Sequence, residues 1–156
     1  MSTSYSGKLR LRACGLLVRD EKLLLVKLKS PVTHTMVWMP PGGGVEFGEN
    51  IENALIREFR EETKLKVKVG NLLHVDELIE AGFHAIEFYF RVYNNFDKPV
   101  LGNDPEHTDE DQILEELRFF SQAEILQHET TPDFIKHNFW NLNDESGLNL
   151  SGNQPM

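Results

Sequence analysis

Three glutamates, Glu58, Glu61 and Glu62, stand three and four residues apart in a segment that also contains Arg57. On an exposed helix, like charges at these spacings repel each other by about 0.2–0.5 kcal/mol per pair. A divalent cation reverses that effect, because Mg²⁺ binds carboxylate oxygens, keeps several waters and can also bind phosphate oxygens. The residue types therefore suit chemistry on a phosphorylated compound.

The orientation of these acids indicates a role inside the fold. Each residue of an α-helix is rotated by about 100° about the helix axis from the one before it. Viewed along this axis, Glu62 lies about 40° and Ile51 about 20° from the direction of Glu58. The carboxylates thus continue the apolar stripe that Phe59 also belongs to, whereas a solvated charged face would lie opposite it. Geometry alone leaves two interpretations open: a metal site, or a structural helix whose arginines pair with its glutamates.

Three glycines, Gly42, Gly43 and Gly44, precede the helix, and Glu49 follows them. Glycine permits tight turns, and a run of three is by itself typical of an ordinary loop. For Glu49 the simpler interpretation is an acid in the first turn, where it complements the helix dipole.

The spacing of these residues resembles the signature of the Nudix hydrolases. That signature is a glycine, five residues, a glutamate, seven residues and then R-E-U-x-E-E-x-G-U, where U is a bulky apolar residue. The matching residues are Gly43, Glu49, Arg57, Glu58, Phe59, Glu61, Glu62 and Leu65. One position departs from the signature: Lys64 replaces the glycine, the residue that most easily adopts the left-handed backbone conformation at a helix end. We expect this exchange to cost about 1 kcal/mol and to leave the carboxylates in place.

The resemblance implies a role for each polar residue of the signature. Glu61 and Glu62 would be direct metal ligands, and Glu58 a ligand or the base that deprotonates the attacking water. Arg57 would orient a carboxylate through charge-assisted hydrogen bonds. Glu49 would be a secondary or water-mediated ligand. Gly42, Gly43 and Gly44 would turn tightly beside the metal site and bring their N–H groups toward a phosphate of the substrate. The implied cofactor is Mg²⁺, with Mn²⁺ as a substitute.

Further candidates lie outside the signature. Some family members use another acid from beyond it, which makes Glu116 a candidate here, with Glu115 and the weaker Glu106 as alternatives. Trp38 is a candidate for stacking on a nucleotide base, and so are two further aromatic residues, Phe83 and Tyr89. Large aromatic side chains are more often part of the core.

The implied activity is metal-dependent hydrolysis of a phosphoanhydride bond in a nucleoside diphosphate linked to another group. The proline typical of ADP-ribose-hydrolysing relatives is missing from IEAGFH, and Tyr89 comes too late for the dinucleoside-polyphosphate branch. By elimination we expect a nucleoside triphosphate, unmodified or oxidised, as substrate. A nucleotide sugar or a dinucleoside polyphosphate is the alternative substrate. A non-catalytic Nudix-like module that binds a nucleotide and regulates a partner is the rival from another class.

The elements around the helix are mostly predicted strands. The first two predicted strands flank the polar turn RDEK and are expected to pair as a hairpin. Pro40 and Pro41 end the third predicted strand, since proline lacks the N–H group that hydrogen-bonds to a neighbouring strand. The fourth and fifth are expected to be antiparallel. These strands are predicted at residues 9–18, 22–29, 36–40, 66–80, 83–94 and 112–120.

Two helix starts and a long loop complete the pattern. Ser121 and Glu124 have the spacing of a capping box, which begins a short helix. Thr131 followed by Pro132 predicts a second start, with apolar residues at helical spacing behind it. Residues 95–111 are expected to be a long surface loop.

The resemblance implies a Nudix-type α/β/α sandwich with a central mixed β-sheet. We expect one domain over residues 1–140 and a disordered tail over 141–156, where the sequence is polar. A chain of 156 residues with 40% hydrophobic residues suffices for one such core.

Charge and cysteine content limit the partners and the compartment. The formal net charge of −9 opposes direct binding to nucleic acid or to an anionic membrane, and any phosphate-bearing substrate would need bound metal. The resemblance implies a small nucleotide as the partner. A single cysteine, Cys14, is expected to be a buried structural thiol in a reducing compartment. The chain shows no signal peptide and no run of about 20 apolar residues, so we expect a cytoplasmic protein. We expect it to be a monomer or a homodimer.

Overall fold

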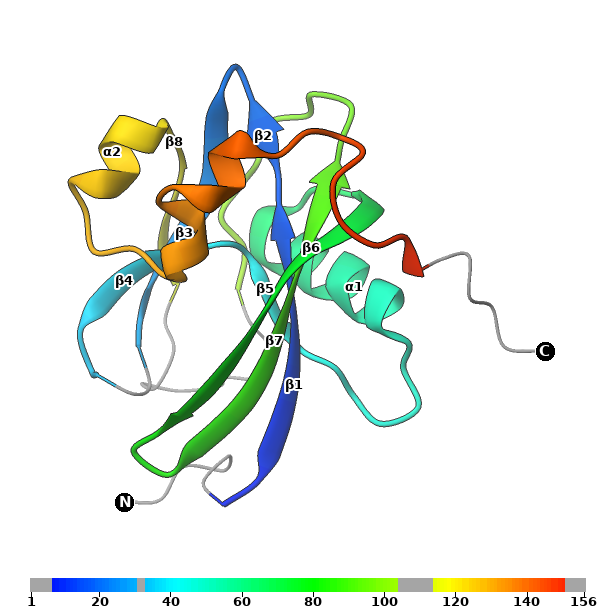
Figure 1. Ribbon diagram of the computed structural model, residues 1–156, viewed down its shortest axis with the longest axis vertical. Coiled ribbons are helices and arrows are strands. Elements are labelled where there is room, and N and C mark those ends of the chain that lie inside the picture. Colours follow the sequence, from blue (N-terminus) through cyan, green and yellow to red (C-terminus); the bar gives the residue numbers. More distant parts are fainter. Residues whose placement is uncertain (1–6, 31–32, 104–113, 151–156) are drawn as a thin grey trace.

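The computed structural model describes residues 7–30, 33–103 and 114–150, and the strands of these segments form two sheets (Figure 1). The first sheet has the order β5-β1-β7-β6. Its strands are β1 (Leu9–Leu16), β5 (Gly42–Gly44), β6 (Lys68–Glu80) and β7 (Phe83–Tyr93). In the second sheet β3 pairs with three strands. Its members are β2 (Val18–Arg19), β3 (Lys22–Lys29), β4 (Met36–Met39) and β8 (Leu114–Phe120).

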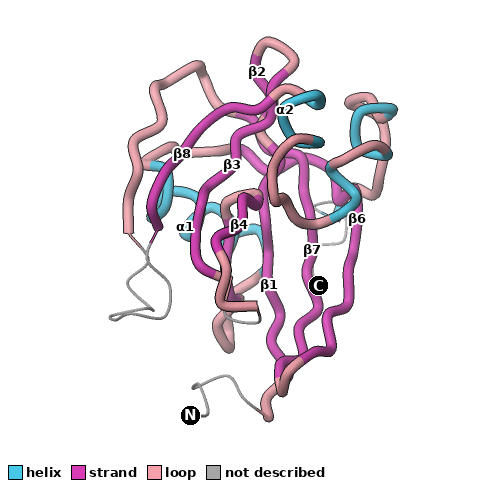
Figure 2. The backbone as a smooth tube through the Cα atoms, turned by 90° about the vertical axis from the view of Figure 1, so that its left-hand side faces the viewer, coloured by secondary structure: helices cyan, strands magenta, loops and turns pink. Residues whose placement is uncertain are grey.

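The first sheet is mixed, as predicted. Strand β1 runs parallel to β7 and antiparallel to β5, while β6 and β7 are antiparallel. Figure 2 shows the long strands β1, β7 and β6 side by side. The second sheet is antiparallel throughout. The predicted central sheet is therefore accompanied by a second one.

Helices cover the two faces of these strands. Helix α1 (Ile51–Thr63) packs on one face, over a core that includes Leu24, Phe59 and Phe90. The other face carries a core that includes Leu25 and Tyr89. Neighbouring residues of one strand enter different cores because strand side chains alternate in direction. The elements over this second core are α2 (Gln122–Leu126) and the 3₁₀ helices η1 (Asp133–Ile135) and η2 (Asn138–Asn141).

The predicted hairpin between residues 9–18 and 22–29 is only partly correct. Its turn forms, with positive φ at Asp20 and Glu21, and β2 pairs with β3. Strand β1, however, belongs to the other sheet, where β5 and β7 occupy its two edges. The physical reason is that the partner of a strand depends on segments far away in sequence, which a local apolar pattern does not specify.

The capping box of Ser121 and Glu124 is present and begins α2, as predicted. The structure differs from the predictions for the helix after Pro132 and for the tail. After Pro132 the chain forms two short 3₁₀ helices instead of one α-helix, because His137 between them leaves the helical region, with φ −135° and ψ −60°. In the described part of the predicted tail, Leu148 exchanges backbone hydrogen bonds with Leu72 of β6. Residues 141–150 therefore lie against the sheet.

The loop after β7 contacts the end of α1. The N–H groups of Val100 and Gly102 donate to the carbonyls of Thr63 and Glu62, each at 2.8 Å. These carbonyls are among the last four of the helix and lack partners within it. Over the described residues, no helix is both long and apolar enough to cross a membrane.

Candidate active site

Helix α1 has well-defined ends. Asn50 caps its start, where the side-chain oxygen accepts a hydrogen bond of 2.8 Å from the N–H of Asn53. At the other end Lys64 adopts the left-handed conformation, with φ 61°, and its N–H donates to the carbonyl of Arg60. The structure thus places a lysine in the conformation that favours glycine.

The helix directs two of its glutamates inward. Glu58 is 0% and Glu62 3% exposed, and both are buried together with Leu55 and Phe59. This confirms the orientation expected from the apolar stripe. Burying a carboxylate is costly unless other groups compensate its charge, so the partners of these acids decide what the site can do.

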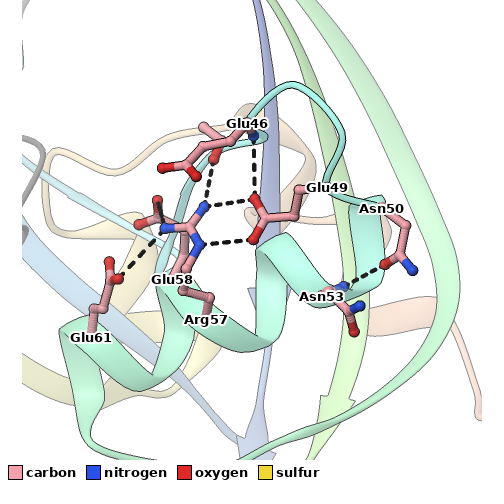
Figure 3. Close-up of polar contacts among 8 residues, drawn as sticks. Glu46, Glu49, Asn50, Asn53, Arg57, Glu58 and Glu61 are labelled. Atoms are coloured by element: carbon pink, nitrogen blue, oxygen red, sulfur yellow. Dashed lines mark hydrogen bonds and ion pairs between the residues drawn. The ribbon is translucent and has the colours of Figure 1, made fainter.

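Arg57 holds two of the acids (Figure 3). Its Nε and Nη2 donate to the two carboxylate oxygens of Glu49, each at 2.9 Å. Its Nη1 donates to Oε1 of Glu58 at 2.9 Å and lies 3.5 Å from Oε1 of Glu61. Nη2 also donates to the carbonyl of Gly44 at 3.1 Å. A planar guanidinium with several donors fixes the directions of these carboxylates.

The same contacts change the pKa of Glu49. Hydrogen bonds from the Arg57 side chain hold the pKa of Glu49 below its ordinary value of 4.5, and the backbone N–H of Glu46 acts in the same direction. Partial burial opposes this shift. In return, hydrogen bonds to Glu49 and Glu58 raise the pKa of Arg57. Both groups are therefore charged at neutral pH.

The three glycines lie against these acids as the short strand β5. The N–H of Gly42 donates to Oε1 of Glu62 at 2.8 Å. A Cβ at Gly43 would lie 2.4 Å from Cδ of Glu58. None of the three has a positive φ. Their role here is close approach of backbone to carboxylate, which differs from the tight turn that we expected.

The donor set fits a hard divalent cation. Glu58, Glu61, Glu62 and Glu49 provide only carboxylate oxygens, the ligands that Mg²⁺ and Mn²⁺ prefer. Because Gly43 has no Cβ, the carboxylate of Glu58 lies directly against the backbone of β5. Within 7–30, 33–103 and 114–150 no three acid, histidine or cysteine side chains already converge on one metal position. Arg57 and the N–H of Gly42 hold three of these carboxylates instead.

Two other predicted site residues lie away from this cluster. Trp38 is 5% exposed in the second core, where its ring contacts the edge of Phe120 at 4.7 Å between centroids. Glu116 on β8 stands opposite Lys27 of β3 and 3.8 Å from Arg118. Tyr89 is buried too, at 1% exposure. Glu106 lies outside the described residues.

A cavity of about 310 Å³ was not expected from the sequence. Side chains from both sheets line it, including Arg10 and Arg12 of β1, Phe83 at the start of β7, and Met39, which immediately precedes the Pro40–Pro41 pair and the glycines. The available signal was the run LRLR, because alternate residues of a strand share a face and the two arginines therefore point the same way.

Cys14 is buried, with 0% exposure, as predicted. Burial raises the pKa of its thiol to about 12, although the nearby Arg12 acts in the opposite direction. The protonated thiol is a poor nucleophile, so Cys14 has a structural role in the core.

Residues 8–138 match the model of the NUDIX domain, and the chain belongs to the Nudix family. An ADP-ribose pyrophosphatase of Methanocaldococcus jannaschii is 44% identical over 61 residues, which are 39% of this chain and 36% of that protein. Diphosphoinositol polyphosphate phosphohydrolase 3-alpha of Mus musculus is 41% identical over 66 residues, 42% of this chain and 40% of that protein. These alignments span about two fifths of the relatives' length.

Among solved structures, a MutT Nudix hydrolase from Burkholderia pseudomallei superimposes with a TM-score of 0.62 and 27% identity. The superposition covers 75% of this chain and 86% of that one. The predicted α/β fold of the Nudix type and the predicted MutT-like family are confirmed.

Proposed function

We propose that this protein is a metal-dependent hydrolase that cleaves a phosphoanhydride bond by attack of water at phosphorus. The observation that carries the proposal is the burial of Glu58 and Glu62 beside a strand without side chains. Two buried carboxylates on one helix edge are costly in a purely structural role. The names of the two relatives, a pyrophosphatase and a phosphohydrolase, support the same reaction class.

In this mechanism Glu58, Glu61, Glu62 and Glu49 would hold Mg²⁺ or Mn²⁺. When bound, the cation neutralises phosphate charge and lowers the pKa of an attacking water. Glu58, where it does not bind the cation, would take the proton of that water on its carboxylate. Arg57 keeps Glu49 and Glu58 in fixed directions, which reduces the reorganisation needed during the reaction.

For the substrate we propose a nucleoside triphosphate, unmodified or oxidised. The cavity of about 310 Å³ is lined by apolar side chains such as Leu28, Met36 and Phe83, together with two arginines and three glutamates. Such a lining suits a base and a sugar. A highly phosphorylated ring would need more cations than this cavity supplies.

ADP-ribose is the second candidate, because the relative with 44% identity is named an ADP-ribose pyrophosphatase. It also contains a nucleoside diphosphate linked to another group, so the same carboxylates would serve. A nucleotide sugar or a dinucleoside polyphosphate would place its nucleoside in the same way.

The test is a substrate panel in the presence of Mg²⁺ and of Mn²⁺, with products identified. The panel contains unmodified and oxidised nucleoside triphosphates, ADP-ribose, a nucleotide sugar, a dinucleoside tetraphosphate and a diphosphoinositol polyphosphate. We expect turnover by the native protein, and a loss on the order of 100-fold in Glu62→Gln. Glu52→Gln, in the first turn of the same helix, is the matched control and should keep its turnover.

Equal turnover by native protein and Glu62→Gln would overturn the proposal. Binding of a nucleotide without turnover of any compound in the panel would favour the non-catalytic module instead. The described contacts favour an enzyme, because all the signature carboxylates are present and hydrogen bonds hold Glu49, Glu58 and Glu62 in place.

A further inference from the structure

Strand β5 separates two groups of opposite charge. A Cβ at Gly43 would meet the carboxylate of Glu58, whereas a Cβ at Gly44 would lie 2.8 Å from Nη2 of Arg10. Successive residues of a strand point to opposite faces, so the glutamates and Arg10 lie on the two faces of a strand that carries no side chains. This strand is also the end of its sheet, in the order β5-β1-β7-β6.

Arg10 links this strand to the cavity. Its side chain lines the cavity and is half-buried, and its guanidinium lies beside Gly44. The carbonyl of Gly44 accepts a hydrogen bond from Arg57, which holds the acids on the other face. One glycine is therefore in reach of both the cavity arginine and the arginine of the carboxylate cluster.

The second arginine of the cavity has a different environment. Arg12 forms an ion pair with Glu87, the residue opposite it on β7, and their side chains are only 17% and 12% exposed. Breaking such a partly buried pair leaves an uncompensated charge and is costly. Arg12 is thus a fixed part of the cavity wall. Arg10 lies two residues earlier, next to the first residue of β1.

We infer that Arg10 binds the phosphate chain of the substrate where it passes over Gly44 between the cavity and the glutamates. The inference rests on the proposed function and names a further substrate-binding residue for it. A guanidinium binds two phosphate oxygens at once through parallel N–H groups. The missing side chain at Gly44 lets the guanidinium of Arg10 come close to the backbone at this point. Arg10 also supplies positive charge to a polyanion in a protein of net charge −9.

The experiment measures binding without catalysis. Calorimetry in EDTA compares a nucleoside triphosphate, the unphosphorylated nucleoside and inorganic tripolyphosphate, each with native protein, Arg10→Gln, Arg10→Lys and Lys8→Gln. Lys8→Gln removes the same charge from an exposed position two residues away. The thermal midpoint of each variant shows whether it is folded.

We expect Arg10→Gln to weaken binding of the triphosphate and of tripolyphosphate on the order of tenfold or more, and to leave nucleoside binding unchanged. Arg10→Lys should recover part of the lost affinity, since lysine keeps the positive charge but lacks the parallel N–H groups of the guanidinium. Lys8→Gln should bind like the native protein. In turnover, Arg10→Gln should raise KM more than it lowers kcat.

The inference would be overturned by unchanged triphosphate binding in Arg10→Gln, by an equal loss of triphosphate binding in Lys8→Gln, or by an equal loss of nucleoside binding in Arg10→Gln. The absence of any phosphate-dependent binding by native protein would also overturn it. Because EDTA removes the cation, these results do not depend on whether Glu62→Gln abolishes turnover. The two proposals can therefore fail separately.

Discussion

Gly43 lies so close to Glu58 that a Cβ on the glycine would stand 2.4 Å from the carboxyl carbon. Glycine is required here for space and not for backbone freedom, because Gly43 lies in strand β5 without a positive φ. The approach also brings the peptide backbone of β5 next to a buried carboxylate. The signature glycine thus shapes the surroundings of the acid that follows it fifteen residues later.

The first prediction concerns this contact. In Gly43→Ala the carboxylate of Glu58 must move away from its position, and its hydrogen bond with Arg57 must change. We expect a loss of turnover on the order of 100-fold, together with about 1–3 kcal/mol of lost stability from overpacking. Steady-state kinetics and urea unfolding measure the two effects.

A matched control for Gly43→Ala is available at Gly70. The nearest atoms to a Cβ there would belong to Tyr93, at 2.8 Å, and to Arg91, and none of them belongs to a glutamate. Gly70→Ala should therefore lose stability while its turnover stays close to native. If Gly43→Ala kept native turnover, the close approach to Glu58 would have no catalytic importance.

The second prediction concerns Arg57. Arg57→Lys keeps the positive charge but loses the two parallel hydrogen bonds to Glu49. We expect turnover to fall about 10- to 100-fold and the apparent affinity for Mg²⁺ to fall with it, as for other residues that orient metal ligands. Titration of activity with Mg²⁺ separates the two effects. Arg60→Lys, at an exposed position of the same helix, should match native protein in both.

The third prediction is a pH dependence of stability. Because Arg57 lowers the pKa of Glu49, this carboxylate stabilises the folded protein fully above its ordinary pKa of 4.5. The contribution disappears as pH falls through the lower pKa of the folded state. Glu49→Gln should therefore be less stable than native protein at pH 7, and the difference should shrink below pH 4.5. Urea unfolding across this range tests it, and a difference that grows on acidification would contradict it.

The fourth prediction concerns Lys64, whose φ is 61°. A residue with a Cβ is strained in this conformation, whereas glycine is not. Lys64→Gly should raise the free energy of unfolding by about 1 kcal/mol and leave turnover unchanged. Lys64→Ala removes the same charge but keeps a Cβ, so it should show no such gain. An equal gain in both variants would assign the effect to the charge.

Much of the site could be predicted from the sequence because it depends on local spacing. Helix α1, its inward-facing Glu58 and Glu62, and the family of the protein follow from the 3.6-residue period and from fixed distances along one segment. The unusual conformation of Lys64 could also be expected, since its position in the signature is that of a glycine.

The tertiary structure decided what remote segments do together. Trp38 has the residue type of a base-stacking group, yet the packing of Phe120 places it in the core. Arg12 pairs with Glu87, which is 75 residues away, and only the parallel pairing of β1 and β7 brings them opposite each other. The cavity beside Arg10 depends on the same pairing and on the second sheet. Local periodicity gives the direction of a side chain, but its partner depends on which strands pair and in which register, and the whole chain decides that.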